Sequence, residues 1–274
     1  MAETKKQYGG CSVTCFLSLM VKVCQAAVGN GLDISGTHFF GGGEPFTEAK
    51  CREIEAAGAT ANPRYWITEI GFIGCSCRGL SDVDDVHLFS DSVATIQRQR
   101  KVEHTDISVN AFLFTSLMTS SPKVMLNVES DDYGVMETRS CGCLLEEVGF
   151  KEHLYNIRSF AKLTGSGMTI IGSDFVRILE EVLPHKYGGA VTDYQLLEEE
   201  DERGQTSLCL IISPDVGAVD EGGVIDTVLE ELRQNAYGGK LAAGFWSQVN
   251  TLCVKRMHPK SSSGKIATLH LMKR

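Results

Sequence analysis

Apolar and polar positions in the first part of the chain predict two helices. Residues 14–28 form a mostly apolar run that predicts a buried or half-buried helix, and the sequence Gly29-Asn30-Gly31 would end it. Thr47 is a suitable N-cap for a second helix through Ala57, and Gly58 follows as its stop. From there to residue 136 the chain alternates between short apolar runs and turn residues, which predicts strands and loops. The clearest of these strands are expected at Val109–Leu117 and Lys123–Val128.

The pattern changes after Arg158. Ser173 is expected to cap a helix whose apolar side chains recur at i, i+3, i+4 and i+7, and Pro184 is expected to end it. Two strand-like runs, 194–197 and 207–212, flank an acidic turn and predict a hairpin. A further amphipathic helix and two further strands are expected at residues 224–232, 251–257 and 266–271. The pattern predicts an α/β chain with two domains, residues 1–158 and a small α+β domain at 159–274.

Composition and charge narrow the class of partner. The 274 residues are 43% hydrophobic and 22% charged, which is typical of a globular protein. The net charge of −9 argues against nucleic acid or an anionic membrane as the main partner, because both need a basic surface. A small phosphate ligand stays compatible, since backbone amides and one or two cations can hold it. The N-terminal apolar stretch is too polar to span a bilayer and is no secretory signal, so we expect a cytoplasmic protein.

Several short segments could carry chemistry, although each has a plainer interpretation. Lys265 follows a run of small residues, which would place one cation on a flexible loop or simply leave a solvated surface lysine. The segment Tyr65-Trp66-Ile67-Thr68-Glu69 offers an aromatic face, a hydroxyl and a possible magnesium ligand, or merely the end of a strand. The turn Gly43-Glu44-Pro45 could bring its backbone close to a ligand. Asp132 and Arg158 could hold ribose hydroxyls or form a surface ion pair.

The order of these segments resembles the acyl-adenylate-forming superfamily, and within it the phenylacetate–coenzyme A ligase-like branch. The resemblance extends from Gly43 to Leu269. It is supported by Asp85-Val86-His87-Leu88, Leu126-Asn127-Val128-Glu129, Ile157-Arg158-Ser159-Phe160, Lys162-Leu163-Thr164-Gly165 and the segment Ile178 to Pro184. It implies the C-terminal part of the superfamily's large N-terminal domain, followed by a small mobile C-terminal domain.

The resemblance also implies a role for each candidate residue. Gly43, Glu44 and Pro45 would line the adenine side, and Tyr65 would stack on the adenine. Thr68 would bind the α-phosphate and Glu69 would bind Mg²⁺. Asp132 would hold the ribose hydroxyls, and Arg158 would assist at a hinge that follows it. Lys265 would bridge the carboxylate and the α-phosphate during adenylation, and the small domain would then rotate for thioester formation.

The sequence departs from the superfamily in three ways. Trp66 replaces the usual glycine after the tyrosine, which could alter the adenine pocket, and no charged residue directly follows Arg158 at the hinge. The Ser/Thr-Gly-rich phosphate loop, which precedes the Glu-Pro turn in the superfamily, is missing from this sequence. The interpretation is therefore a truncated ligase, inactive or weak alone, or one that needs a separate N-terminal segment.

The cysteines suggest a metal site independently. Ten cysteines include the pairs Cys75-Ser76-Cys77 and Cys141-Gly142-Cys143, with His87 between them. Thiolate and imidazole are the donors that zinc prefers, although buried thiols are the alternative interpretation. Some members of the ligase branch hold a structural zinc in this way. We expect Cys77, His87, Cys141 and Cys143 as ligands, with Cys75 as the alternative first ligand. The remaining cysteines, Cys11, Cys15, Cys24, Cys51, Cys209 and Cys253, are expected to be thiols.

Two functions remain open from the sequence. The first is an ATP-dependent carboxylate–coenzyme A ligase that uses ATP, Mg²⁺, coenzyme A and a small carboxylic acid and releases AMP. The second is a non-catalytic nucleotide- or zinc-binding regulatory module that kept the fold. A homo-oligomer is a further possibility for the assembly.

Overall fold

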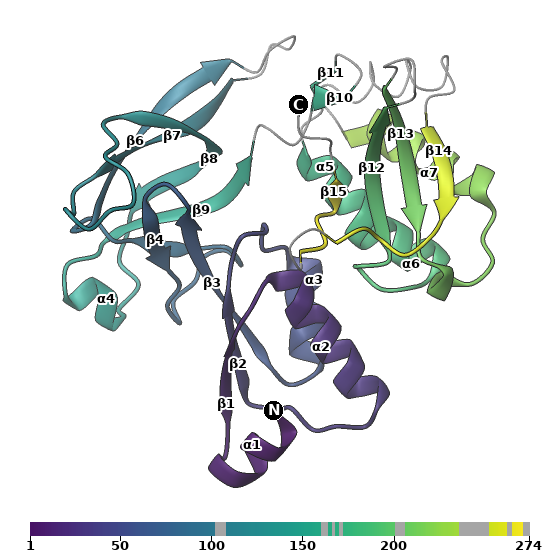
Figure 1. Ribbon diagram of the computed structural model, residues 1–274, viewed down its shortest axis with the longest axis horizontal. Coiled ribbons are helices and arrows are strands. Elements are labelled where there is room, and N and C mark those ends of the chain that lie inside the picture. Colours follow the sequence, from purple (N-terminus) through teal and green to yellow (C-terminus); the bar gives the residue numbers. More distant parts are fainter. Residues whose placement is uncertain are drawn as a thin grey trace. The chain divides into compact units, whose positions relative to one another are not determined.

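The computed structural model describes residues 1–101, 108–159, 164–165, 168–169, 172–200, 206–235, 252–261 and 265–270. These residues fall into two compact units, and the division between them comes after residue 160. Figure 1 shows the elements of each unit, which are described separately below. Among the described residues, no helix is long and apolar enough to cross a lipid bilayer.

The first unit is built around one mixed sheet. Among the described residues, nine strands follow the order β1-β2-β3-β4-β5-β9-β8-β7-β6. They are β1 (Cys11–Thr14), β2 (Thr37–Gly41), β3 (Thr60–Ile67), β4 (Gly71–Cys75), β5 (Val86–Leu88), β6 (Val93–Lys101), β7 (Ser108–Ser116), β8 (Val128–Thr138) and β9 (Glu152–Ser159). Strands β1, β2 and β3 are parallel, and all later neighbours are antiparallel.

Helices provide the crossovers that the parallel strands require. After α1 (Ala2–Tyr8), α2 (Leu17–Gly29) joins β1 to β2, and α3 (Glu48–Ala56) joins β2 to β3. The two crossover helices lie side by side in Figure 1. The expected N-cap is confirmed, because the side chain of Thr47 accepts a hydrogen bond from the backbone amide of Lys50. The short helix α4 (Leu144–Glu147) precedes β9.

The prediction of a strand at Lys123–Val128 is wrong. The backbone there forms a turn, and β8 begins only at Val128. Asn127 has a left-handed φ of 49°, which interrupts an extended strand. Side-chain hydroxyls of β7 hold the turn instead: Ser116 accepts from the Met125 amide at 2.9 Å, and Thr115 accepts from the Asn127 amide at 2.9 Å.

The second unit places helices on one face of a small sheet. Among the described residues, its four strands follow the order β14-β13-β12-β15, and a separate two-stranded ribbon precedes them. The strands are β10 (Thr164–Gly165), β11 (Met168–Thr169), β12 (Tyr194–Glu200), β13 (Thr206–Ile212), β14 (Leu252–Arg256) and β15 (Leu269–His270), and the longest helix is α7 (Glu221–Asn235). The expected hairpin is confirmed, since β12 and β13 pair antiparallel from Tyr194↔Ile212 to Glu200↔Thr206.

Pro184 does not end its helix. The helix α5 (Gly172–Arg177) continues through a π-helical turn (Ile178–Val182) into α6 (Leu183–Tyr187), and Pro184 lies in the first turn of α6. The π-helical turn directly before it shifts the hydrogen-bond pattern, with the Leu183 amide bonded to the Ile178 oxygen, so the helix continues past a residue that has no N–H to donate. The buried side chains of these helices pack with α7 against one face of the sheet, where Leu196, Leu208 and Leu210 point.

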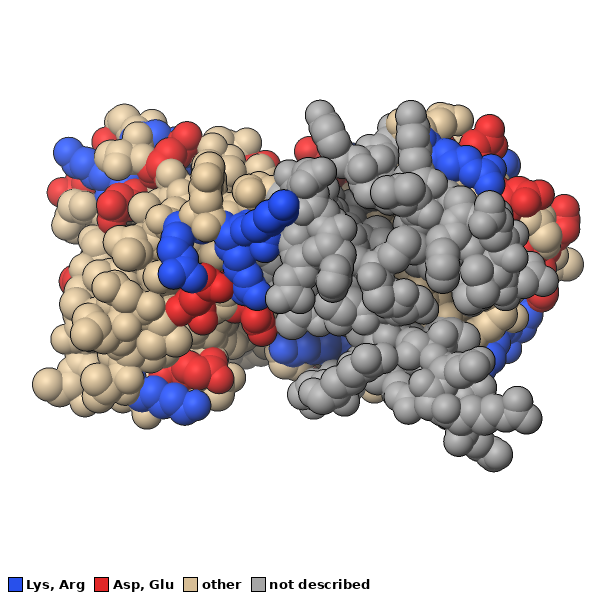
Figure 2. Space-filling view, turned by 90° about the horizontal axis from the view of Figure 1, so that it is seen from above, with Lys and Arg blue, Asp and Glu red and all other residues tan. Residues whose placement is uncertain are grey.

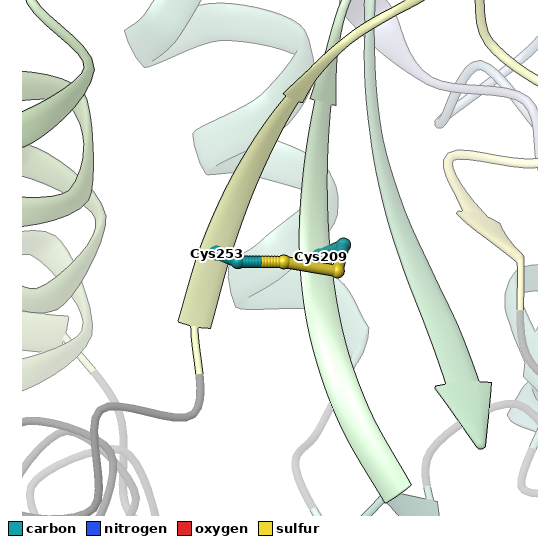
Figure 3. Close-up of a disulfide and its surroundings, with 2 residues drawn as sticks. All are labelled: Cys209 and Cys253. Carbon is teal, nitrogen blue, oxygen red and sulfur yellow. A yellow bond between two sulfur atoms is a disulfide. The ribbon is translucent and has the colours of Figure 1, made fainter. Parts of the chain in front are cut away.

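The opposite face of this sheet carries a disulfide that corrects the expectation of free thiols. Cys209 in β13 and Cys253 in β14 are directly paired in the parallel ladder and form a disulfide (Figure 3). Cys209 packs there with Leu197 and Ile211. The sequence could not indicate the bond, because the two residues lie 44 positions apart in separate strands.

Candidate functional site

The glycine-rich turn after β2 packs tightly on its neighbours. A Cβ atom on Gly42 would lie 2.0 Å from the backbone oxygen of Arg64, so only glycine fits there. The carboxylate of Glu44 is buried and accepts hydrogen bonds from the Ser18 amide at 3.2 Å and the Ser18 hydroxyl at 2.7 Å. Since Ser18 lies in the first turn of α2, the negative charge meets the positive end of that helix. Gly43 is exposed and Pro45 is half-buried.

Tyr65 and Asp132 lie in direct contact. The hydroxyl of Tyr65, in β3, donates a hydrogen bond of 2.7 Å to Oδ2 of Asp132, in β8, although the residues are 67 positions apart. Burial, and next the Asp132 charge, raise the pKa of Tyr65 well above its ordinary value. The phenol therefore stays protonated and acts as the donor. The Tyr65 ring also lies against Phe114, with 6.2 Å between the ring centroids.

Thr68 and Glu69 follow on from the same strand. Both lie in the turn between β3 and β4, and both side chains are exposed. They directly follow β3, which carries Tyr65. One short segment therefore contains an aromatic ring, a hydroxyl and a carboxylate. Trp66, which replaces a glycine in the superfamily's pattern, is half-buried, and its ring would lie 3.3 Å from a Cβ atom on Gly42.

Arg158 pairs with an aspartate that sequence reasoning missed. Its Nη1 atom donates to Oδ2 of Asp84 at 2.9 Å. The same carboxylate accepts from the backbone amides of Asn156 and Ile157 at 2.8 and 2.9 Å. Asp84 is 4% exposed, so it holds the end of β9 as well as the guanidinium. In the sequence, the adjacent aspartates Asp84 and Asp85 were the feature that could have indicated an acidic partner for Arg158.

Lys265 belongs to the second unit, where it is half-buried. It precedes β15, and residues 262–264 of its loop lie outside the described residues. The side chain of Gln195 contacts the backbone on both sides of this position, as described below.

The four metal ligands expected from the sequence come together in the first unit. Among the described residues, one donor atom each from Cys77, His87, Cys141 and Cys143 lies within 4.8 Å of the others. The thiol of Cys75 is not part of this cluster. Sγ of Cys77 lies 3.8 Å from Sγ of Cys141, and Nε2 of His87 lies 3.4 and 3.3 Å from Sγ of Cys141 and Cys143. A tetrahedral zinc site requires about 3.8 Å between sulfurs and about 3.5 Å between sulfur and nitrogen, so the donor set fits.

Neighbouring groups hold the donors in place. Nδ1 of His87 lies 2.7 Å from the backbone oxygen of Phe150. With its proton on Nδ1, the ring donates a hydrogen bond to that oxygen, and the lone pair on Nε2 faces the thiols. The Glu146 carboxylate accepts from the Ser140 hydroxyl at 2.6 Å and from the amides of Gly142 and Cys141 at 2.6 and 2.9 Å. The Ser140 bond, followed by the two amide bonds, lowers the pKa of Glu146 to about 2. Burial raises the pKa of the Cys77 thiol, so a bound cation would be needed to keep it as thiolate.

A buried network that sequence reasoning missed packs against His87; it consists of His153, Asp85 and Arg139. The rings of His87 and His153 lie 4.0 Å apart between centroids, and Nδ1 of His153 lies 2.8 Å from Oδ1 of Asp85. Arg139 forms an ion pair with the other oxygen of Asp85. His153 and Asp85 are both 1% exposed at their side chains. His153, in β9, has no sequence spacing typical of a ligand, so its position beside His87 could be recognised only from the fold.

Charges on the described surface are mixed in sign. Figure 2 shows basic and acidic side chains beside one another on one face. In the first unit, Arg98 and Arg100 both pair with Glu129, at 2.6 and 2.8 Å.

Comparisons with known proteins identify the fold. No family model and no curated protein match the sequence. A mutant of the amide bond synthetase McbA from Marinactinospora thermotolerans aligns with a TM-score of 0.56 and 13% identity, over 97% of this chain and 53% of that one. O-succinylbenzoate coenzyme A synthetase (MenE) from Bacillus subtilis, in complex with ATP and magnesium, gives 0.53 and 13%, over 96% and 52%. The anthranilate–CoA ligase AuaEII, with anthranoyl-AMP, gives 0.53 and 10%, over 93% and 48%.

These similarities confirm the mixed α/β fold expected from the sequence, which the chain shares with these synthetases and this ligase. The chain spans about half the length of these solved structures.

Proposed function

We propose that this chain is part of an AMP-forming carboxylate–coenzyme A ligase similar to phenylacetate–coenzyme A ligases. The observation that carries the proposal is the contact between Tyr65 and Asp132. The sequence resemblance gives these two residues to the adenine and the ribose of one nucleotide, and such roles require them to lie close together. The fold shared with ligases over more than nine-tenths of the chain supports the same function.

In the proposed first step, a carboxylate oxygen of a small acid attacks the α-phosphorus of ATP. The bond from that phosphorus to the bridging oxygen breaks, and pyrophosphate leaves with its electron pair. The Thr68 hydroxyl would donate to an α-phosphate oxygen, Glu69 would bind Mg²⁺, and the Lys265 ammonium would neutralise charge between the two anions. Gly43, Glu44 and Pro45 would contribute backbone atoms beside the adenine, because the Glu44 side chain is held by Ser18.

In the proposed second step, the deprotonated thiol of coenzyme A attacks the acyl carbonyl, and AMP leaves. The Lys265 ammonium is not needed here, which is why rotation of the second unit about a hinge after Arg158 is part of the proposal. The domain boundary expected from the sequence between residues 158 and 159 would serve this movement. An aryl or arylacetic acid is the proposed substrate class, by resemblance to the phenylacetate ligases.

Zinc is proposed as a structural ion held by Cys77, His87, Cys141 and Cys143. Three thiolates and one imidazole would complete its tetrahedral coordination and leave no open position for substrate. The ion would therefore contribute to folding and take no part in ligation.

The metal cluster also supports a second candidate function, a non-catalytic module that binds zinc or a nucleotide. Its four donor atoms already lie within 4.8 Å of one another, whereas Thr68 and Glu69 lie on an exposed turn. Measurable adenylation would exclude this alternative.

Carboxylate-dependent exchange of pyrophosphate into ATP tests the ligase proposal. It is measured with a panel of aryl and arylacetic acids, on the chain alone and with a polypeptide that supplies the remaining half of the ligase fold. Lys265→Ala should lower the exchange rate by about a hundredfold, as loss of a preorganised charge does. The charge-matched control Lys123→Ala, at an exposed turn, should leave the rate unchanged. Absence of exchange under every condition would overturn the proposal.

A further inference from the structure

The side chain of Gln195 is fully buried in β12 and makes three hydrogen bonds to one segment of backbone. Its Nε2 atom donates to the backbone oxygens of Lys260 at 2.9 Å and Ala267 at 2.7 Å. Its Oε1 atom accepts from the backbone amide of Lys260 at 2.8 Å. A glutamine amide has two N–H donors, so both are used here.

The two anchor points lie on either side of Lys265. Lys260 comes before the lysine and Ala267 after it, so one amide group joins both ends of the segment that carries the cation. The end after Lys265 is held by further bonds, from the Leu196 amide to the Thr268 oxygen at 2.9 Å and from the Thr268 hydroxyl to Glu180 at 2.5 Å. Glu180 is itself only 2% exposed, so the second anchor rests on the helical layer of the same unit.

We infer that Gln195 is a positioning residue for Lys265, an inference that rests on the proposed ligase function. A lysine on a loop stabilises a transition state only when its position is fixed before the reaction, because ordering the loop otherwise raises the barrier. The Gln195 amide fixes both ends of the segment and carries no charge. It therefore restrains the backbone without forming an ion pair that would neutralise the Lys265 ammonium.

A buried amide suits this role better than the side chains of similar size. A glutamate at position 195 could not donate to the oxygens of Lys260 and Ala267 while ionised, and methionine would leave both oxygens without that partner. Sequence spacing gave no signal for the residue, since it lies 65 and 72 positions from its two partners.

The test compares Gln195→Met with Ile211→Val in the full chain. Ile211 faces Gln195 across the β12–β13 ladder and is fully buried, so the control perturbs the same sheet without touching the segment. Hydrogen exchange at the Lys260 amide should become faster by about tenfold or more in Gln195→Met, as expected for loss of a hydrogen bond, and should change far less in the control. Unchanged exchange at Lys260 would overturn the inference. If Gln195→Met does not fold, Gln195→Asn replaces it. Hydrogen exchange at the Lys260 amide in Gln195→Asn, whose amide is on a shorter side chain, is then compared with exchange in the original protein.

Kinetics then tests the link to Lys265. Gln195→Met should lower the turnover of adenylation by about tenfold with little change in the KM for ATP, because geometry rather than binding is lost. Transfer of a supplied acyl-AMP to coenzyme A should be unaffected. The double variant with Lys265→Ala should be no slower than Lys265→Ala alone. Additive losses would show that Gln195 acts elsewhere. Full adenylation by Lys265→Ala would overturn the role proposed for Lys265, and this inference with it, whereas absence of adenylation by the original protein would overturn the proposed function.

Discussion

Arg158 donates its hydrogen bond to Asp84 and lies opposite Tyr133 in the β8–β9 ladder, whereas Asp132 lies opposite Ser159. The guanidinium is thereby attached to the loop before β5. Asp84 also binds two backbone amides of β9, so a single carboxylate fixes both the strand and the arginine at the end of the first unit.

Replacement of Asp84 by alanine should destabilise the first unit by about 3 kcal/mol, because it leaves a partly buried guanidinium and two amides without this acceptor. The free energy of unfolding from urea titration measures the effect. Asp131→Ala, which removes an exposed carboxylate from β8, serves as the control and should change stability by less than about 0.5 kcal/mol. Equal losses in the two variants would show that Asp84 contributes little.

Asp132→Asn should weaken AMP binding by about tenfold, since a charged acceptor for the ribose hydroxyls becomes neutral. Calorimetric titration with AMP and with its 2′,3′-dideoxy analogue measures the difference. The analogue should bind the variant and the original protein with the same affinity, because it has no ribose hydroxyls for residue 132 to hold. Tyr65→Phe, which keeps the ring and loses the hydroxyl, should retain most of the AMP affinity, and a greater loss in Tyr65→Phe than in Asp132→Asn would contradict the assigned roles.

Protein purified without chelator should contain about one zinc ion per chain, and Cys143→Ser should lose it and become less stable. Cys75→Ser is the matched control, because Cys75 is paired with His87 in the β4–β5 ladder while its thiol lies outside the donor cluster. Metal analysis by mass spectrometry distinguishes the two variants. Retention of zinc by Cys143→Ser, or its loss from Cys75→Ser, would reassign the ligands.

Stability should fall at alkaline pH as Tyr194 ionises. Burial raises the pKa of Tyr194 to about 12, and its hydroxyl donates to the backbone oxygen of Gly188 at 2.7 Å. Folding therefore favours the protonated phenol. The resulting stability is complete below the unfolded pKa of about 10 and is lost as the pH rises toward about 12. Urea titrations across this range should show a smaller decline for Tyr194→Phe; identical declines would assign the effect to other groups.

Local chemistry explains what the sequence could predict. Thr47 caps α3 through its own side chain, and the hairpin of β12 and β13 needs only neighbouring strands and a polar turn. The four metal donors were recognisable because thiol and imidazole ligands have few other reasons to cluster. Relationships that need the whole fold escaped prediction: the Cys209–Cys253 disulfide, the bond from Arg158 to Asp84, and the amide of Gln195. Pro184 was misjudged because a π-helical turn precedes it.

The turn between β7 and β8 offers a place to divide the protein. Val124 is 97% exposed and Leu126 is 76% exposed, yet the strands on either side are paired from Phe114↔Val128 onward. Two fragments separated there would still share the β7–β8 and β5–β9 ladders. The first fragment would carry Cys77 and His87 and the second Cys141 and Cys143, so neither holds a complete donor set. Reassembly of such a split protein would then respond to zinc, which would make the divided chain a reporter of the ion.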